Sequence, residues 1–148
     1  MKTKGEIIIA IEFKNLNLEV LDITTNATPD IYINVNGITF TKRVLDDLGY
    51  PQFVQYAVDK DNKVFAIRAC KGNESRAVPF SKPKGEQKNT LSTSNRNITE
   101  IVRAIMGNDW KSDCRYRVQG YYIANEKTII FELTEGTECN YRPSNDGE

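Results

Sequence analysis

The sequence predicts an α+β fold in which two β-α-β-β units, each a strand, a short helix and a hairpin, pack as one compact and mostly antiparallel domain. Segments with the apolar patterns of strands outnumber segments with helical spacing. Only residues 42–48 and 98–107 have helical spacing, and a glycine ends each of them. The length of 148 residues suits one domain, or two small halves that share a core.

The first half contains several strand signals. Residues 6–13 are apolar and β-branched, which predicts a buried strand. Residues 31–37 alternate apolar and polar side chains and end in an Asn-Gly turn, and a short strand follows at 38–40. Residues 53–58 and 63–69 then form the two arms of a predicted hairpin.

A short helix is predicted between these strands. Thr41 is placed to cap its N-terminus, and the spacing puts Val44, Leu45 and Leu48 on one buried face. Gly49 supplies the left-handed residue that ends a helix, and a proline two positions later prevents the helix from continuing.

The second half repeats this order. Residues 98–107 predict a helix with a buried face made of Ile98, Ile101, Val102, Ile105 and Met106. Residues 114–136 predict a hairpin that turns at 124–126. The chain is thus divided into an N-terminal strand region, a first unit, a basic connector with a short strand or two, a second unit and a disordered acidic tail, at residues 1–30, 31–70, 71–97, 98–135 and 136–148.

The two halves also align with each other. Residues 41–49 align without a gap on residues 99–107, and residues 61–69 align on residues 125–133. Repeated units of this size usually cannot bury their apolar faces alone and pack on each other. The alternative is a coincidence between two common β-α-β-β units.

The composition argues against an enzyme. The chain has no histidine, so the commonest general acid-base group and the commonest metal ligand are missing. Its three cysteines are an odd number without C-x-x-C spacing, which argues against a disulfide framework and a zinc site. We therefore predict no catalytic residue, no metal and no cofactor. No apolar run approaches the ~20 residues of a membrane span, which predicts a cytoplasmic protein with no membrane partner.

Charge is unevenly placed although the net charge is zero. Residues 68–96 contain seven Lys or Arg and two Glu, whereas residues 132–148 contain five acidic residues and one Arg. A basic middle and an acidic tail would steer an anionic partner toward one side of the molecule. Alternatively, both segments are ordinary solvated loops.

Residues 31–69, with the sequence IYINVNGITFTKRVLDDLGYPQFVQYAVDKDNKVFAIRA, resemble the AbrB/SpoVT swapped-hairpin family. The likeness rests on Gly37, Ile38, Phe40, Leu45, Leu48, Gly49, Val54, Val58 and Ile67. It implies a small barrel of two interlocked copies, as a homodimer or as a tandem pair in one chain, that binds DNA through Arg and Lys. The family's proline before the helix and its arginine-rich first strand are missing, because Thr41 precedes the helix and residues 30–37 have no positive charge.

Two functions follow. The first is a non-enzymatic AbrB-like regulator of a mobile element that binds nucleic acid, with contacts from Lys42, Arg43, Arg68, Lys71, Lys82, Lys84, Arg115 and Arg117. The segment YRVQGYYIANEKTIIFEL is also similar to small uncharacterised proteins of phages and integrative elements, among them inhibitors of host defence. The alternative is therefore an anti-CRISPR-like inhibitor that binds a host protein through Trp110, Tyr121 and Tyr122 and the acidic end of the chain.

Each candidate also has a structural interpretation. Lys42 and Arg43 are either an anion site at a helix start or two solvated side chains, and the basic loop at 81–88 either binds phosphate or serves solubility. Strand alternation puts Arg115 and Arg117 on the face opposite Tyr116, as in an ordinary strand with tyrosine inside and arginine outside. Trp110 is either an exposed anchor or a cap on the core.

Overall fold

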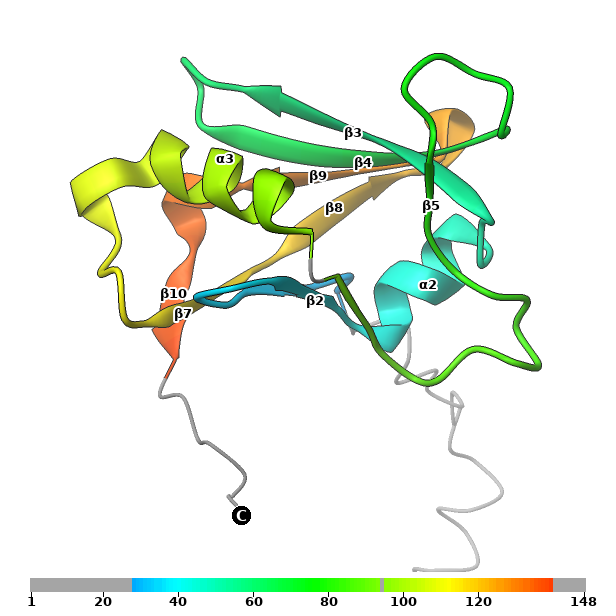
Figure 1. Cartoon of the computed structure of the whole chain (residues 1–148), viewed down its shortest axis with the longest axis horizontal. Coiled ribbons are helices and arrows are strands. Elements are labelled where there is room, and N and C mark those ends of the chain that lie inside the picture. The colour runs from blue at the N-terminus through cyan, green and yellow to red at the C-terminus, as the bar shows by residue number, and fades with distance from the viewer. Residues whose placement is uncertain (1–27, 94, 140–148) are drawn as a thin grey trace, which may run out of the picture.

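Two antiparallel sheets face each other across a shared core in the computed structural model, which describes residues 28–93 and 95–139 (Figure 1). The first sheet, sheet A, has the spatial order β10 (Thr137–Cys139), β7 (Arg115–Val118), β1 (Ile31–Ile33), β2 (Ile38–Phe40) and β6 (Leu91–Thr93). The second, sheet B, has the order β5 (Val78–Pro79), β3 (Phe53–Asp59), β4 (Val64–Cys70), β9 (Thr128–Glu132) and β8 (Gly120–Ile123). The predicted α+β class is confirmed.

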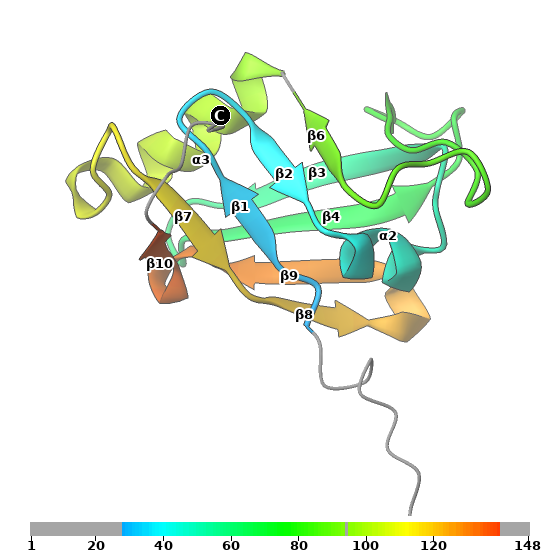
Figure 2. The same ribbon diagram turned by 90° about the horizontal axis from the view of Figure 1, so that it is seen from below.

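Two helices lie at opposite ends of this body, α2 (Lys42–Leu48) at one end and α3 (Arg96–Met106) at the other (Figures 1 and 2). Short 3-10 turns follow at η2 (Gly107–Asp109), η3 (Ala124–Glu126) and η4 (Leu133–Glu135). Within the described ranges, none of the helices has the length and apolar composition needed to cross a membrane. The strand predicted at residues 6–13 lies outside the described residues.

The core consists of the inward-facing residues of both sheets. Alternation buries Ile31, Ile33, Ile38 and Phe40 from sheet A and Val54, Phe65, Ile67, Ile129 and Phe131 from sheet B. An aromatic row crosses the core, with ring centroids 6.3 Å apart for Phe40 and Tyr56, 5.8 Å for Tyr56 and Phe65, and 5.7 Å for Phe65 and Phe131. These rings join the two sheets.

Tyr56 makes the free energy of unfolding depend on pH. Burial raises the pKa of its hydroxyl from 10.0 to about 12. Between these two values the native state keeps a proton that the unfolded chain loses, so the free energy of unfolding should fall by about 2 kcal/mol as pH rises through this window. Urea unfolding of the wild type and of Tyr56→Phe at about pH 8, 10 and 11 measures the first part of this fall, about 1 kcal/mol between pH 10 and 11. Equal pH slopes for the two proteins would contradict it.

The first helix forms as the sequence predicts. Val44, Leu45 and Leu48 are buried, and Gly49 ends the helix in the left-handed conformation at φ 77°. The predicted role of Thr41 needs a correction, because its side chain makes no capping hydrogen bond. Its hydroxyl instead donates to the Asp30 carbonyl oxygen at 2.7 Å, which ties the helix start to the chain before β1.

The second helix starts two residues earlier than predicted. Asn95 caps it by accepting a hydrogen bond from the Asn97 N–H at 3.0 Å. The prediction that Ile101 is buried is wrong, since this side chain is 43% exposed. The buried face is centred near Val102, and at ~100° per residue Ile101 points away from that centre.

The predicted hairpin at 114–136 turns at Ala124–Glu126 as expected, but its first arm is divided between the sheets. β7 pairs with β1 in sheet A, and β8 pairs with β9 in sheet B. Gly120 stands at this corner, where a Cβ would clash with the Pro29 carbonyl oxygen and lie 2.7 Å from carbons of Ile129 and Phe131. The close approach accounts for glycine at this position.

Residues 137–139, which the sequence placed in a disordered tail, form β10. This strand pairs antiparallel with β7, with Thr137 opposite Arg117 and Cys139 opposite Arg115. The ladder hydrogen bonds explain its order. Residues 140–148 of the predicted tail lie outside the described residues.

The hairpins β3–β4 and β8–β9 have the same local geometry, and equivalent residues in them are a constant number of positions apart in the chain. Lys63 ends the first turn at φ 56°, and Lys127, 64 positions later, ends the second at φ 50°. The N–H of Leu133 donates to the Lys63 carbonyl and the N–H of Ala69 donates to the Lys127 carbonyl, both at 3.0 Å. The central strands β4 and β9 pair directly, so the hairpins are related by an approximate two-fold axis.

The two predicted helical segments match less well. Thr41 precedes α2, whereas Thr99 lies inside α3 and is buried. α2 has seven residues and α3 has eleven. The equivalence of 41–49 with 99–107 therefore holds at the terminal glycines, both with positive φ, but not at the helix starts.

Candidate nucleic-acid interface

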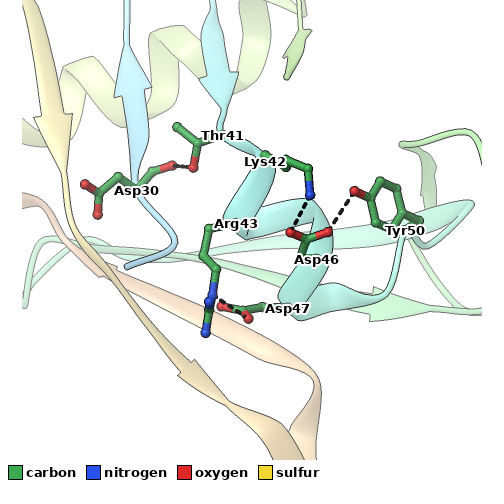
Figure 3. Close-up of polar contacts among 7 residues, drawn as sticks. All are labelled: Asp30, Thr41, Lys42, Arg43, Asp46, Asp47 and Tyr50. Carbon is green, nitrogen blue, oxygen red and sulfur yellow. Dashed lines mark hydrogen bonds and ion pairs between the residues drawn. The ribbon is translucent and has the colours of Figure 1, made fainter. Parts of the chain in front are cut away.

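The two cations at the start of α2 have carboxylate partners one turn further along the helix (Figure 3). Lys42 Nζ lies 2.9 Å from Asp46 Oδ2, and Arg43 Nε lies 2.9 Å from Asp47 Oδ1. The hydrogen bond to Asp46 raises the pKa of Lys42. Such i, i+4 pairs offset the unfavourable position of the cations at a helix start, so no bound anion is needed to explain them.

The predicted cations between β4 and β6 are exposed at the end of the body that holds α2 (Figure 1). They are Lys71, Lys82 and Lys84. Lys84 and Lys42 line a hollow of about 580 Å³ beside Asp46 and Tyr50. These three lysines have no ion-pair partner among the described residues, in contrast to Lys42 and Arg43.

Arg68 points outward from sheet B. Its guanidinium donates to Gln55 Oε1 at 3.1 Å and lies 3.9 Å from Glu74. Strand alternation places it on the side of β4 opposite the buried Phe65 and Ile67. It is thus separated from Arg115 and Arg117, which belong to sheet A.

Arg115 and Arg117 share the outward face of sheet A, which Figure 2 shows in front. Tyr116, which lies between the two arginines, and Val118, which follows Arg117, are buried, as alternation predicts. Tyr32 is paired with Arg117 in the ladder, and the hydroxyls of Thr39 and Ser92 lie 3.0 Å apart further along the sheet. We call this surface the Arg115 face, defined by Tyr32, Thr39, Ser92, Arg115 and Arg117.

Arg117 is held by a carboxylate. Its Nε donates to Asp30 Oδ2 at 2.6 Å, and this hydrogen bond raises the pKa of Arg117. The Asp30 side chain is 6% exposed, but that of Arg117 is 55% exposed, so solvent screens the pair. Part of the positive charge of Arg117 is neutralised at close range, while its outer N–H groups still reach the surface.

Arg115 differs from the other candidates. Its guanidinium carbon lies 4.2 Å from the centre of the Tyr32 ring, a cation–π contact. Its Nε is buried without a hydrogen-bond partner. Among the described residues it has no carboxylate within ion-pair distance. A flat cationic group with unused donors is thus fixed on this face.

Sequence reasoning missed Arg103, which holds the end of the Arg115 face together. Its guanidinium donates to the carbonyls of Asn34 at 2.9 Å, Ile33 at 3.3 Å and Lys111 at 3.3 Å, and also to the Cys114 carbonyl. Burial lowers the pKa of Arg103. One side chain of α3 therefore fixes the end of β1 against the start of β7. No local sequence signal marks this role.

Tyr32 and Asn34 were also missed, but a signal for them exists. They are the polar positions of the alternating segment IYINVNG, whose apolar positions Ile31 and Ile33 are buried. Alternation alone places their side chains together on the outer face.

The three predicted protein-binding residues differ in how far they are exposed. Trp110 is 7% exposed and stacks on Tyr116 at 4.5 Å between ring centroids, so it caps the core and leaves little surface for a partner. Tyr121 and Tyr122 are 45% and 36% exposed on β8, an edge strand of sheet B. The Tyr121 hydroxyl donates to Glu135 Oε1 at 3.1 Å.

The described residues contain no group of three or more His, Cys, Asp and Glu side chains placed to hold a metal ion. Comparisons with protein-family models, curated proteins and solved structures found no match for this chain.

Proposed function

We propose that this chain is a non-enzymatic protein that binds nucleic acid through the Arg115 face. The observation that carries the proposal is Arg115 itself, whose guanidinium is stacked on Tyr32 and has a buried Nε without a hydrogen-bond partner. The protein covers this Nε, so a ligand with acceptor oxygens or ring nitrogens would bind the terminal N–H groups of the same guanidinium, which have no carboxylate partner among the described residues.

The other residues of the face suit the same ligand. Arg117 presents a 55% exposed side chain next to Tyr32, and hydroxyl groups of Thr39 and Ser92 continue the surface toward β6. Arginine and hydroxyl groups bind phosphates, and aromatic rings stack on bases. The exposed lysines before β6 add positive charge beyond that edge of the sheet.

The matched hairpins support the resemblance to swapped-hairpin regulators. The 64-residue separation, the two lysines with positive φ and the reciprocal hydrogen bonds are what two copies of one unit would produce. We therefore include in the proposal that the chain is a tandem AbrB-like pair that acts as a regulator. In such a pair the contacts need not be equivalent in the two halves, and here Arg115 and Arg117 belong to the second half only.

Reversing one charge on the Arg115 face should weaken binding. We expect Arg115→Glu to lower the affinity for labelled oligonucleotides about tenfold or more and to reduce the slope of log affinity against log salt by about 1. Fluorescence anisotropy with a mixed-sequence single strand and its duplex, from low to physiological salt, measures both quantities.

Arg68→Glu is the matched control, because it makes the same charge change on the outer side of sheet B. We expect it to alter the affinity far less, and circular dichroism should show both variants folded. Arg115→Gln separates loss of the donor from repulsion by a carboxylate. Failure of the wild type to bind either oligonucleotide at low salt would overturn the proposal, and so would equal losses for Arg115→Glu and Arg68→Glu.

A further inference from the structure

A hollow of about 520 Å³ adjoins the Arg115 face between the β1–β2 turn and the start of β7. It is lined by Asn34, Val35, Asn36, Gly37, Thr39, Asp113 and Arg115. Its size is within the ~300–1,000 Å³ range of sites for small molecules. Resting on the proposed function, we propose that this hollow binds an unpaired base of a single-stranded nucleic acid.

The charge of the lining selects a base over a phosphate. Asp113 is exposed and lies two positions before Arg115, so a carboxylate and a guanidinium line the same hollow. A carboxylate repels phosphate, but it accepts hydrogen bonds from the amino and imino groups of a base. The guanidinium donates to the ring nitrogens and carbonyl oxygens of the same kind of ligand.

The polar side chains at the β1–β2 turn add both hydrogen-bond donors and hydrogen-bond acceptors to the hollow. Asn34 Nδ2 donates one hydrogen bond to Thr39 Oγ1 at 2.9 Å, which fixes the amide and leaves its oxygen as an acceptor. The exposed Asn36 side chain also lines the hollow. Donors and acceptors therefore lie side by side, as they do on the edge of a base.

Both walls of the hollow are held in place before any ligand binds. Arg103 hydrogen-bonds the carbonyls of Asn34 on the β1 side and Cys114 on the β7 side. Gly37 completes the turn, where a Cβ would lie 2.5 Å from the Thr93 carbonyl oxygen. A preformed site loses little entropy on binding.

The concave shape implies a single strand. A base in a duplex is stacked and paired, so its pairing edge is not free to enter a hollow. An unpaired base can turn out of the chain, while Arg117 and the hydroxyls of the Arg115 face contact the adjoining backbone. Stacking of a neighbouring base on Tyr32 or Arg115 fits the same geometry.

The experiment compares fluorescein-labelled probes of about 16 nucleotides of four kinds: a mixed-sequence single strand, its duplex, a strand of equal length with abasic sites throughout, and a homopolymer of each base in turn. We expect the single strand to bind about tenfold more tightly than the duplex or the abasic strand. We expect the homopolymers to differ from one another by several-fold.

Asp113→Asn should change contacts to the phosphate backbone and contacts to the base in opposite directions. Removing the negative charge should strengthen binding of the abasic strand and reduce the several-fold differences among the homopolymers to about twofold or less. Asp61→Asn, an exposed aspartate in the β3–β4 turn, is the matched control and should change neither.

The outcomes separate this inference from the function on which it rests. Equal binding of single strand, duplex and abasic strand would overturn the base site while leaving nucleic-acid binding in place. Unchanged homopolymer differences in Asp113→Asn would also overturn it. Absence of binding to every probe at low salt would overturn both.

Discussion

Replacing Phe131 by alanine should cost about 4 kcal/mol of unfolding free energy. Phe131 is fully buried on β9, stacks on Phe65 with ring centroids 5.7 Å apart, and belongs to the shared core of the two sheets. The substitution removes a buried ring and leaves a cavity that the rigid sheets do not close. Since small domains have only about 5–15 kcal/mol in total, the variant should be close to unfolding at physiological temperature.

Urea denaturation followed by circular dichroism measures this loss, with Tyr122→Ala as the control. Tyr122 is an aromatic residue on the neighbouring strand β8, but it is 36% exposed, so its removal should cost less than about 1 kcal/mol. Similar losses for the two variants would show that the core does not lie between the sheets as described.

Gly120→Ala should be the second most damaging change, with a cost of about 3 kcal/mol. The added Cβ would press on the Pro29 carbonyl oxygen and lie 2.7 Å from both Ile129 Cγ2 and Phe131 Cε1. Two of these three neighbours are core side chains and one is backbone, so none of them moves aside cheaply. The chain would have to open the corner between β7 and β8.

Thermal and urea unfolding of Gly85→Ala provide the comparison. A Cβ at Gly85 meets no atom within 4 Å, and its φ is not in the left-handed region, so this variant should change stability by less than about 0.5 kcal/mol. A Gly120→Ala protein as stable as Gly85→Ala would contradict the tight corner.

Local patterns predicted most of the individual elements. The periodicity of Val44, Leu45 and Leu48 and the position of Gly49 gave the first helix, and the hairpin turns fell where polar residues interrupt the apolar alternation. The division of the β7–β8 arm was missed because local patterns do not show which sheet a strand joins. Here β7 pairs with β1 and β8 with β9, and the chain at Gly120 runs so close to the Pro29 carbonyl that no side chain fits, a contact between residues distant in the sequence.

The candidate site was less predictable than the fold. Sequence reasoning found Arg115 and Arg117 because they are interleaved with tyrosines in the segment CRYRVQGYY, and basic and aromatic side chains together suit nucleic acid. It could not separate Arg115 from Lys42, Arg43 and Arg117, since only the structure shows that the other three have carboxylate partners. Asp113 and Asn34 join the site through pairing of β1 with β7, a contact that no local pattern encodes.

The pairing of β1 with β7 also sets when the protein can finish folding during its synthesis. Ile31 pairs with Val118, so at about 5–20 residues per second the ribosome needs roughly 4 to 17 seconds to add the residues between them. β4 likewise lacks one of its pairing partners until β9 has been synthesised. During that interval the nascent chain exposes the unpaired edge of β1 and the unpaired edge of β4, with which strands of other chains could pair. Both edges are covered once residues 115–132 have been made, because β7 then pairs with β1 and β9 with β4.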